Sequence, residues 1–137
     1  MIGLDTNVLV RYLIQDDPGQ SDLATKLIEE NCSKHSPGRI SMVVLCELVW
    51  VLRGAYRYPK KTIVDALGQL LITSDFEVEN EPVARLSLDA YKNGAADYAD
   101  YVIGFSNITS GCDVTYTFDH NFADSRIAKL LCIVRSE

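Results

Sequence analysis

The sequence lacks any hydrophobic run long enough to cross a membrane. A membrane-spanning helix needs about 20 consecutive apolar residues, and no stretch of the 137 residues approaches that composition. The chain begins Met-Ile-Gly-Leu-Asp, without a basic region ahead of an apolar segment. A secretory signal peptide requires both features. We therefore expect no signal peptide, no membrane partner and a cytoplasmic location.

Cysteine and histidine are also scarce, and their spacing is not that of a zinc site. No Cys-x-x-Cys pair occurs, and the only histidines are His35 and His120. Zinc sites typically need closely spaced ligands. We expect the four cysteines to be small buried residues in a reducing compartment. They are Cys32, Cys46, Cys112 and Cys132.

Basic residues are outnumbered by acidic ones, 13 to 19, which gives a net charge of −6. This balance argues against a protein that holds nucleic acid through a broad basic surface. It does not exclude a nuclease, because bound divalent cations reverse the local sign of a carboxylate site. The length and the 47% hydrophobic content fit a single domain, residues 1–137, with a core of its own.

Short apolar runs alternate with longer amphipathic segments along the whole chain. This alternation predicts an α/β fold, a parallel sheet flanked by helices. Strands are expected at residues 2–4, 39–41, 76–78, 114–117 and 132–134. Helices are expected at residues 8–14, 18–31, 43–56, 60–72, 82–92, 97–109 and 125–130.

Acidic residues occupy positions where such a fold would bring them together. Asp5 and Asp119 each end an expected strand, and ligands of open α/β sheets bind outside the carboxyl ends of the strands. Glu47 lies in an otherwise apolar helical stretch. Asp97 and Asp100 are three residues apart, so they share one helix face.

Converging carboxylates repel one another unless a cation neutralises them. Ligand sets made only of oxygen suit Mg²⁺ or Mn²⁺. Such ions bind phosphate oxygens, activate a water molecule and stabilise an in-line displacement at phosphorus. The acids therefore point to metal-dependent phosphoryl chemistry.

Each acid also has a purely structural explanation. Asp5 and Asp97 could cap helices, and Asp100 could be a first-turn acid favoured by the helix dipole. Asp119 could be a turn residue. Glu47 could form an ion pair with an arginine, for which the candidates are Arg11 and Arg53.

Four segments together resemble a known family. They are residues 2–13 (Ile-Gly-Leu-Asp-Thr-Asn-Val-Leu-Val-Arg-Tyr-Leu), 41–52 with Glu47, 96–103 (Ala-Asp-Tyr-Ala-Asp-Tyr-Val-Ile) and 115–122 (Thr-Tyr-Thr-Phe-Asp-His-Asn-Phe). In this order they resemble PIN-domain ribonucleases, most closely the VapC-type toxins of bacterial and archaeal toxin–antitoxin pairs.

The resemblance implies a three-layer α/β/α fold with a central, mainly parallel sheet. It also implies an endoribonuclease that depends on Mg²⁺, with Mn²⁺ as an alternative, and that cleaves single-stranded regions of RNA. The three main acidic positions match Asp5, Glu47 and Asp100, and the fourth, which often acts through water, matches Asp119. Asp97 fits an additional acid. Polar positions that orient the ligands match Thr6, Asn7 and Thr117.

Two residues depart from the family pattern. Tyr101 follows the third acid where a small residue is usual, and we expect it to narrow the approach of RNA. His120 follows the fourth acid, where it could contact a phosphate or be a solvated loop residue.

The resemblance also implies partners. Such toxins bind a small antitoxin whose basic residues reach the acidic site, and they commonly form homodimers. Residues 43–52 and 63–71, with Trp50, could contribute to a dimer interface or to the core, and we favour the core for most. Basic residues that could guide RNA phosphates, or form a solvated helix face, are Arg11, Arg53, Arg57, Lys60 and Lys61.

Other functions fit the sequence less well. An inactive PIN scaffold that binds RNA or protein is the main alternative, but the acids are present. A phosphatase with an aspartyl nucleophile would need Asp-x-Asp after the first strand, where the chain has Asp5-Thr6-Asn7. A phosphorylated receiver domain would need an acidic pair and a mid-chain aspartate at the end of a strand, which this chain also lacks. The sequence identifies neither the RNA target nor the number of metal ions.

Overall fold

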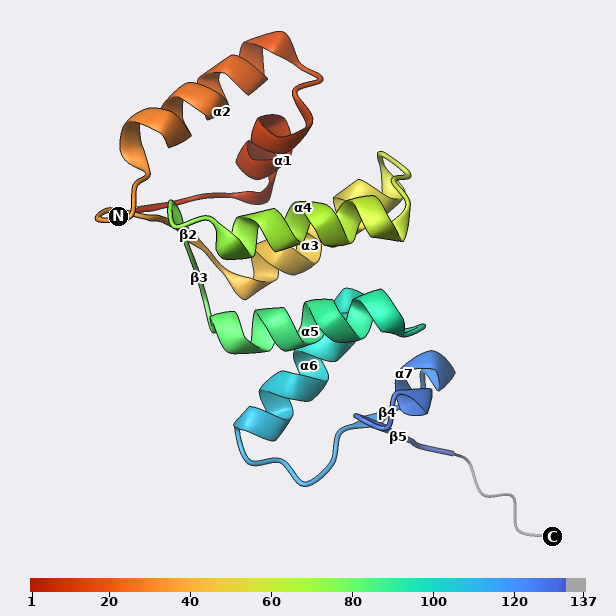
Figure 1. Cartoon of the computed structure of the whole chain (residues 1–137). Coiled ribbons are helices and arrows are strands. Elements are labelled where there is room, and N and C mark those ends of the chain that lie inside the picture. Colours follow the sequence, from red (N-terminus) through yellow and green to blue (C-terminus); the bar gives the residue numbers. More distant parts are fainter. Residues whose placement is uncertain (133–137) are drawn as a thin grey trace, which may run out of the picture. The chain divides into compact units, whose positions relative to one another are not determined.

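The structure is a computed structural model, and it describes residues 1–132. Strands and helices alternate along it, as expected for an α/β fold (Figure 1). The elements are β1 (Ile2–Gly3), α1 (Thr6–Ile14), α2 (Pro18–Asn31), β2 (Gly38–Ile40), α3 (Met42–Gly54), α4 (Lys60–Ile72), β3 (Phe76–Val78), α5 (Glu81–Asn93), α6 (Tyr98–Thr109), β4 (Tyr116–Thr117), α7 (His120–Asp124) and β5 (Lys129–Leu130).

The described chain forms two compact units, residues 1–84 and the part from Arg85 onward. In the first unit, β1, β2 and β3 form a sheet in that order, and both strand pairs are parallel. In the second unit, β4 and β5 also pair in parallel. The expected α/β class with parallel strand pairing is thus confirmed. The single domain expected over residues 1–137 stays a prediction.

The helices of the first unit pack as a connected group. Helix α1 contacts both α2 and α3, and α4 packs against α3 (Figure 1). Gln15 ends α1 in a left-handed conformation, with φ of 60°. Its side-chain amide donates to Tyr12 O and Thr25 Oγ1, which ties the end of α1 to α2.

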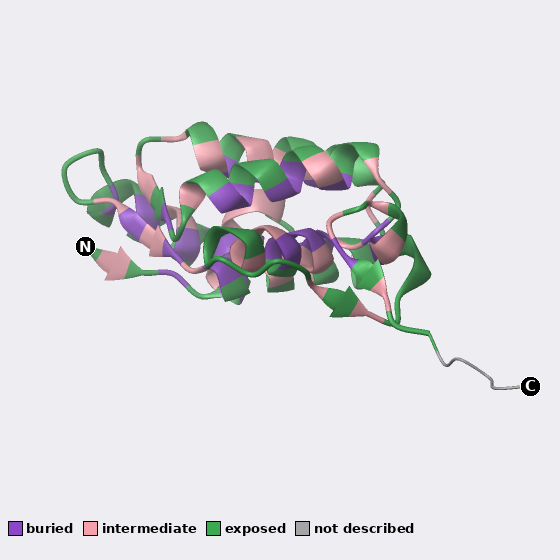
Figure 2. Cartoon of the chain, turned by 90° about the horizontal axis from the view of Figure 1, so that it is seen from below, coloured by how far each residue is buried: buried purple, intermediate pink, exposed green. Residues whose placement is uncertain are grey.

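The core of the first unit follows the hydrophobic periodicity of its helices. Leu45, Leu48 and Leu52 of α3 are almost fully buried, as are Ile63 and Leu67 of α4. Figure 2 shows long helices with buried residues along one side and exposed residues along the other. Most of the apolar residues in residues 43–52 and 63–71 therefore belong to the core, as expected.

Aromatic residues build the core of the second unit. Tyr91 and Tyr98 meet edge to face, with 6.1 Å between their ring centroids. Tyr101 and Phe122 do the same at 6.5 Å. Tyr101 is only 2% exposed, and its hydroxyl accepts a hydrogen bond from Ala96 N. The expectation that Tyr101 narrows an RNA approach is therefore wrong, because it is a core residue.

The segment after β4 differs from the predicted one. The expected helix at residues 125–130 is wrong: the helix is α7, and it begins directly after Asp119, whose side chain accepts from Phe122 N. Arg126 has a φ of 66°, which a continuing helix cannot accommodate. The last described strand is β5, while Cys132 lies outside any strand and residues 133–134 lie outside the described residues.

Two smaller expectations also need correction. Ser41 does not extend the second strand, because its side chain caps α3 by accepting from Val44 N. Of the cysteines, Cys32 is buried as expected, Cys46 is half-buried, and Cys112 and Cys132 are exposed. Cys112 lies in the loop between α6 and β4, and Cys132 follows β5, so neither belongs to a helix or strand.

Candidate active site

Asp5 and Glu47 line the same pocket in the first unit. This pocket has a volume of about 410 Å³ and lies between α1 and α3. Asp5 reaches it from the end of β1, and Glu47 from the second turn of α3. The lining residues are Asp5, Thr6, Asn7, Val10, Arg11, Glu47, Val51, Ala55 and Tyr56. The structure thus brings together two of the predicted acids with the predicted polar residues Thr6 and Asn7.

Asp5 caps α1, as its structural explanation required. Its Oδ1 accepts a hydrogen bond from Thr6 N at 2.7 Å. Capping uses one carboxylate oxygen, so Oδ2 is left for a further ligand. Thr6 is 5% exposed, and within the described residues its Oγ1 has no hydrogen-bond partner. A buried hydroxyl beside an acid is expected to bind water or to support a ligand.

Glu47 lies on the exposed side of α3. Residues four before it and three after it, Val43 and Trp50, are 66% and 51% exposed. Of the two arginines predicted as alternative ion-pair partners of Glu47, Arg11 pairs with Asp16 instead, and an ion pair with Arg53 stays a prediction. A carboxylate that lines a pocket is a suitable metal ligand.

The second unit brings together the other three predicted acids. Asp97 caps α6, with its Oδ1 accepting from Tyr98 N at 2.9 Å. Asp100 Oδ2 accepts in return from Asp97 N at 3.3 Å, which completes a capping box. Asp119 caps α7 and is itself oriented by Thr117, whose Oγ1 accepts from Asp119 N at 3.0 Å. Thr117 therefore contacts the backbone of an acidic residue, and its predicted role in orienting the metal ligands stays a prediction.

Burial and neighbouring negative charges raise the pKa of Asp100. Loss of hydration raises its pKa above the usual value of 3.8, and the negative charges of Asp119 and Asp97 raise it further. The hydrogen bond from Asp97 N partly opposes these effects. A carboxylate whose ionised form is disfavoured in this way gains most from a bound cation.

The five acids thus form two groups, Asp5 with Glu47 and Asp100 with Asp97 and Asp119. Their donor atoms are all carboxylate oxygens, the donor set that Mg²⁺ and Mn²⁺ prefer. Within residues 1–132, no three or more acidic, histidine or cysteine side chains already form a metal cage. Convergence of the two groups on one metal stays a prediction.

The family model of the PIN domain matches residues 2–127. The chain belongs to the PIN domain family. PIN domains are generally nucleases, and they generally use divalent metals. The three-layer α/β/α fold with a mainly parallel sheet follows from this membership together with the observed strand pairing. No curated protein sequence matches the chain.

Tyr56 of this PIN domain also lines the pocket of Asp5 and Glu47, although no motif in the sequence marks it as a site residue. Its hydroxyl donates to Asp16 Oδ2 at 2.9 Å and accepts from Arg11 Nη1 at 3.3 Å. Tyr56 also stacks on Tyr58, with 5.7 Å between the ring centroids. Forty-five residues separate Tyr56 from Arg11, so no local pattern could have revealed this contact.

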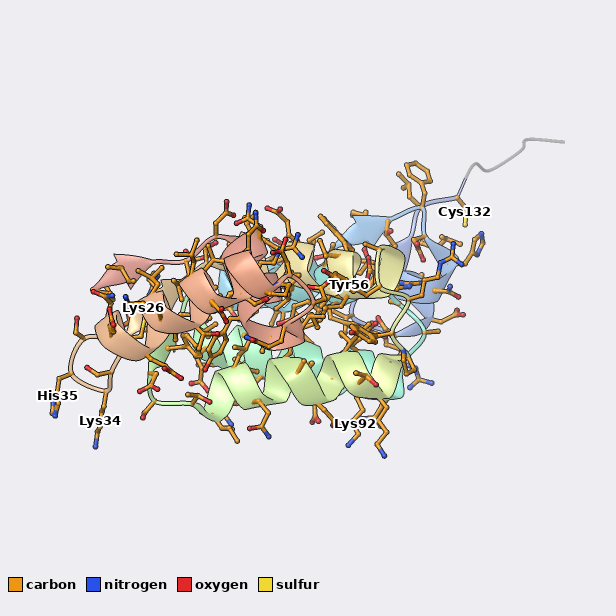
Figure 3. The ribbon with its side chains drawn as sticks, turned by 90° about the horizontal axis from the view of Figure 1, so that it is seen from above. Lys26, Lys34, His35, Tyr56, Lys92 and Cys132 are labelled. Atoms are coloured by element: carbon orange, nitrogen blue, oxygen red, sulfur yellow. The ribbon has the colours of Figure 1, made fainter. Side chains whose placement is uncertain are left out.

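His120, in contrast, is the exposed first residue of α7 and not a loop residue, and its contact with a phosphate stays a prediction. His35 is exposed in the loop between α2 and β2, next to Lys34 (Figure 3). None of the helices in the described part of the chain is long and apolar enough to span a membrane.

Proposed function

We propose that this PIN domain is a divalent-metal-dependent endoribonuclease that cleaves single-stranded regions of RNA. The observation that carries the proposal is the pocket that Asp5 and Glu47 both line, in which the basic residue Arg11 pairs with Asp16. Membership of a nuclease-type family supports it. The resemblance to VapC-type sequences extends it to the toxin of a toxin–antitoxin pair, acting in the cytoplasm.

In this proposal, Asp5, Glu47 and Asp100 hold the metal, with Asp119 and Asp97 as further ligands or as acceptors for metal-bound water. A bound Mg²⁺ or Mn²⁺ supplies charge neutralisation and an activated water molecule. Asp5 Oδ1 and Asp100 Oδ2 accept backbone hydrogen bonds, and this fixes the orientation of their carboxylates. Asp119 Oδ1 accepts from Phe122 N in the same way, and Thr117 Oγ1 accepts from the backbone N of Asp119.

Cleavage of a labelled single-stranded RNA tests the proposal. Wild type is expected to cut with Mg²⁺ or Mn²⁺ and to stop in the presence of EDTA. Asp5→Asn keeps the capping oxygen but loses the charge, and we expect it to lower the rate on the order of 10²-fold or more. Asp65→Asn, an exposed acid of α4, is the matched control and leaves the rate unchanged. Equal cleavage by wild type and Asp5→Asn would contradict the proposal.

An inactive PIN scaffold is the second candidate function. Such a scaffold would bind RNA or protein. Fluorescence anisotropy would then detect RNA binding, but no divalent metal would produce cleavage of the bound RNA. The five acids favour the nuclease, because an inactive scaffold has no need to keep carboxylates that repel one another.

The toxin role implies two partners, a small antitoxin and a second copy of the chain. The net charge of −6 fits an antitoxin segment that is basic. Expression of wild type in bacteria should arrest growth, and Asp5→Asn should not. Co-expression with the protein of an adjacent small reading frame should restore growth, and light scattering after size exclusion measures whether the chain is a homodimer.

A further inference from the structure

Arg11 lies at the junction of two pockets in the first unit. It lines the pocket of Asp5 and Glu47, and it also lines a second pocket of about 310 Å³ between α1 and α2. Asn7, one helical turn earlier, lines both as well. Of the five basic residues that could guide RNA, none of the other four lines either pocket. Arg11 is thus the cation placed beside the proposed catalytic acids.

Three side chains hold the Arg11 guanidinium in place. Its Nε donates to Gln20 Oε1 at 2.7 Å, and its Nη1 donates to Asp16 Oδ1 at 3.1 Å and to Tyr56 Oη at 3.3 Å. The Tyr56 hydroxyl in turn donates to Asp16 Oδ2, which locks the carboxylate and the phenol together. Figure 3 labels Tyr56 beside the end of α3. An arginine oriented in advance loses little conformational entropy when it binds a ligand.

This network leaves one end of the guanidinium available. Within the described residues, the side-chain hydrogen bonds of Arg11 use Nε and Nη1, and none uses Nη2. The Arg11 side chain is 30% exposed, so a ligand in the pocket can contact it. Guanidinium N–H groups match the oxygens of a phosphate in geometry and charge. A plain structural ion pair with Asp16 would explain Nη1 but not the position between two pockets.

We propose that Arg11 binds a backbone phosphate of the RNA through Nη2, beside the nucleotide that enters the Asp5–Glu47 pocket. Asp16, Gln20 and Tyr56 are positioning residues that hold the guanidinium. The inference rests on the proposed ribonuclease function and names its substrate contact. It adds one fixed phosphate-binding group beside the acids of a chain whose net charge is −6.

Steady-state cleavage of a single-stranded RNA over a series of salt concentrations tests this contact. Arg11→Gln is expected to raise KM about tenfold or more, the effect of a lost charged hydrogen bond. It should also flatten the slope of log(kcat/KM) against log salt by about 0.7, the value for one phosphate contact on a single strand. Arg11→Lys should retain the slope and still raise KM, because it keeps the charge but not the planar fork.

Arg39 provides a matched control. It is also an arginine of the first unit in contact with two carboxylates, Glu77 at 3.3 Å and Glu79 at 3.8 Å, and its side chain is 40% exposed, but it lines neither pocket. Arg39→Gln should leave both KM and the salt slope unchanged. Tyr56→Phe, which loosens the guanidinium without removing its charge, should raise KM with the slope unchanged.

The possible outcomes separate the two proposals. If wild type does not cleave RNA, the ribonuclease proposal fails. If wild type cleaves and Arg11→Gln changes KM and salt slope no more than Arg39→Gln does, the phosphate contact is wrong. Thermal unfolding of each variant shows whether it still folds. If Arg11→Gln does not fold, Arg11→Lys and Tyr56→Phe provide the test, and an unchanged KM in both variants would overturn the inference.

Discussion

The rotation of α3 about its own axis decides whether Glu47 faces the Asp5 pocket, and replacing Leu48 by alanine tests that rotation. Leu48 is fully buried, whereas Val43, on the opposite side of the helix, is 66% exposed. Leu48→Ala removes the burial of about three carbon groups, worth about 2.4 kcal/mol, and leaves a cavity that adds to the loss. We expect a total loss of about 3–4 kcal/mol, near the middle of the range for buried leucines.

Val43→Ala is the matched control from the same helix. Its methyl groups are largely in water already, and alanine favours a helix over valine, so its effect should stay within about 0.5 kcal/mol. Urea denaturation followed by circular dichroism gives both free energies of unfolding from the midpoints, provided that the slopes agree. Equal losses in the two variants would mean that α3 is rotated differently. Glu47 would then not line the same pocket as Asp5.

Three further predictions concern local contacts. Gly38→Ala should destabilise the protein by about 1–3 kcal/mol in the same denaturation assay, because a Cβ would lie 2.8 Å from Cys32 Sγ in the middle of the first sheet. The hydrogen bond from Tyr56 lowers the pKa of Asp16 below 3.8, so it stabilises the fold above that pH and is lost as the pH falls through the lowered pKa. The melting temperatures of wild type and Tyr56→Phe should therefore differ at pH 6 and converge as the pH falls below the lowered pKa of Asp16; a constant difference would refute this linkage. Asp100→Asn should melt higher than wild type at pH 7 in EDTA, because it removes a half-buried charge and keeps the acceptor for the helix cap; a lower melting temperature would contradict the electrostatic argument.

Local patterns predicted most of the helices and the acids that cap them. The bounds of α2 and α4 and of β3 agree with the expected residues, because proline, capping residues and hydrophobic periodicity act over a few positions. The segment around α7 was mispredicted, since the cap at Asp119 and the parallel pairing of β4 with β5 outweigh the weak helical signal of residues 125–130. Contacts between distant residues, such as Arg11 with Tyr56, could not be predicted, because nothing near either residue indicates the other.

Helix capping and metal binding are alternative explanations for the acids in the sequence, but in the structure the same acid can do both. Asp5, Asp97 and Asp119 are N-caps, and Asp100 occupies the third position of α6, whereas Glu47 lies beyond the first turn of its helix, α3. The positive end of a helix dipole favours a nearby carboxylate, which offsets part of the repulsion that grouping such charges creates. A cap also needs only one of the two carboxylate oxygens. Helix N-termini can therefore hold these carboxylates in fixed orientations, and Glu47, without such support, is the acid whose position depends most on the packing of α3.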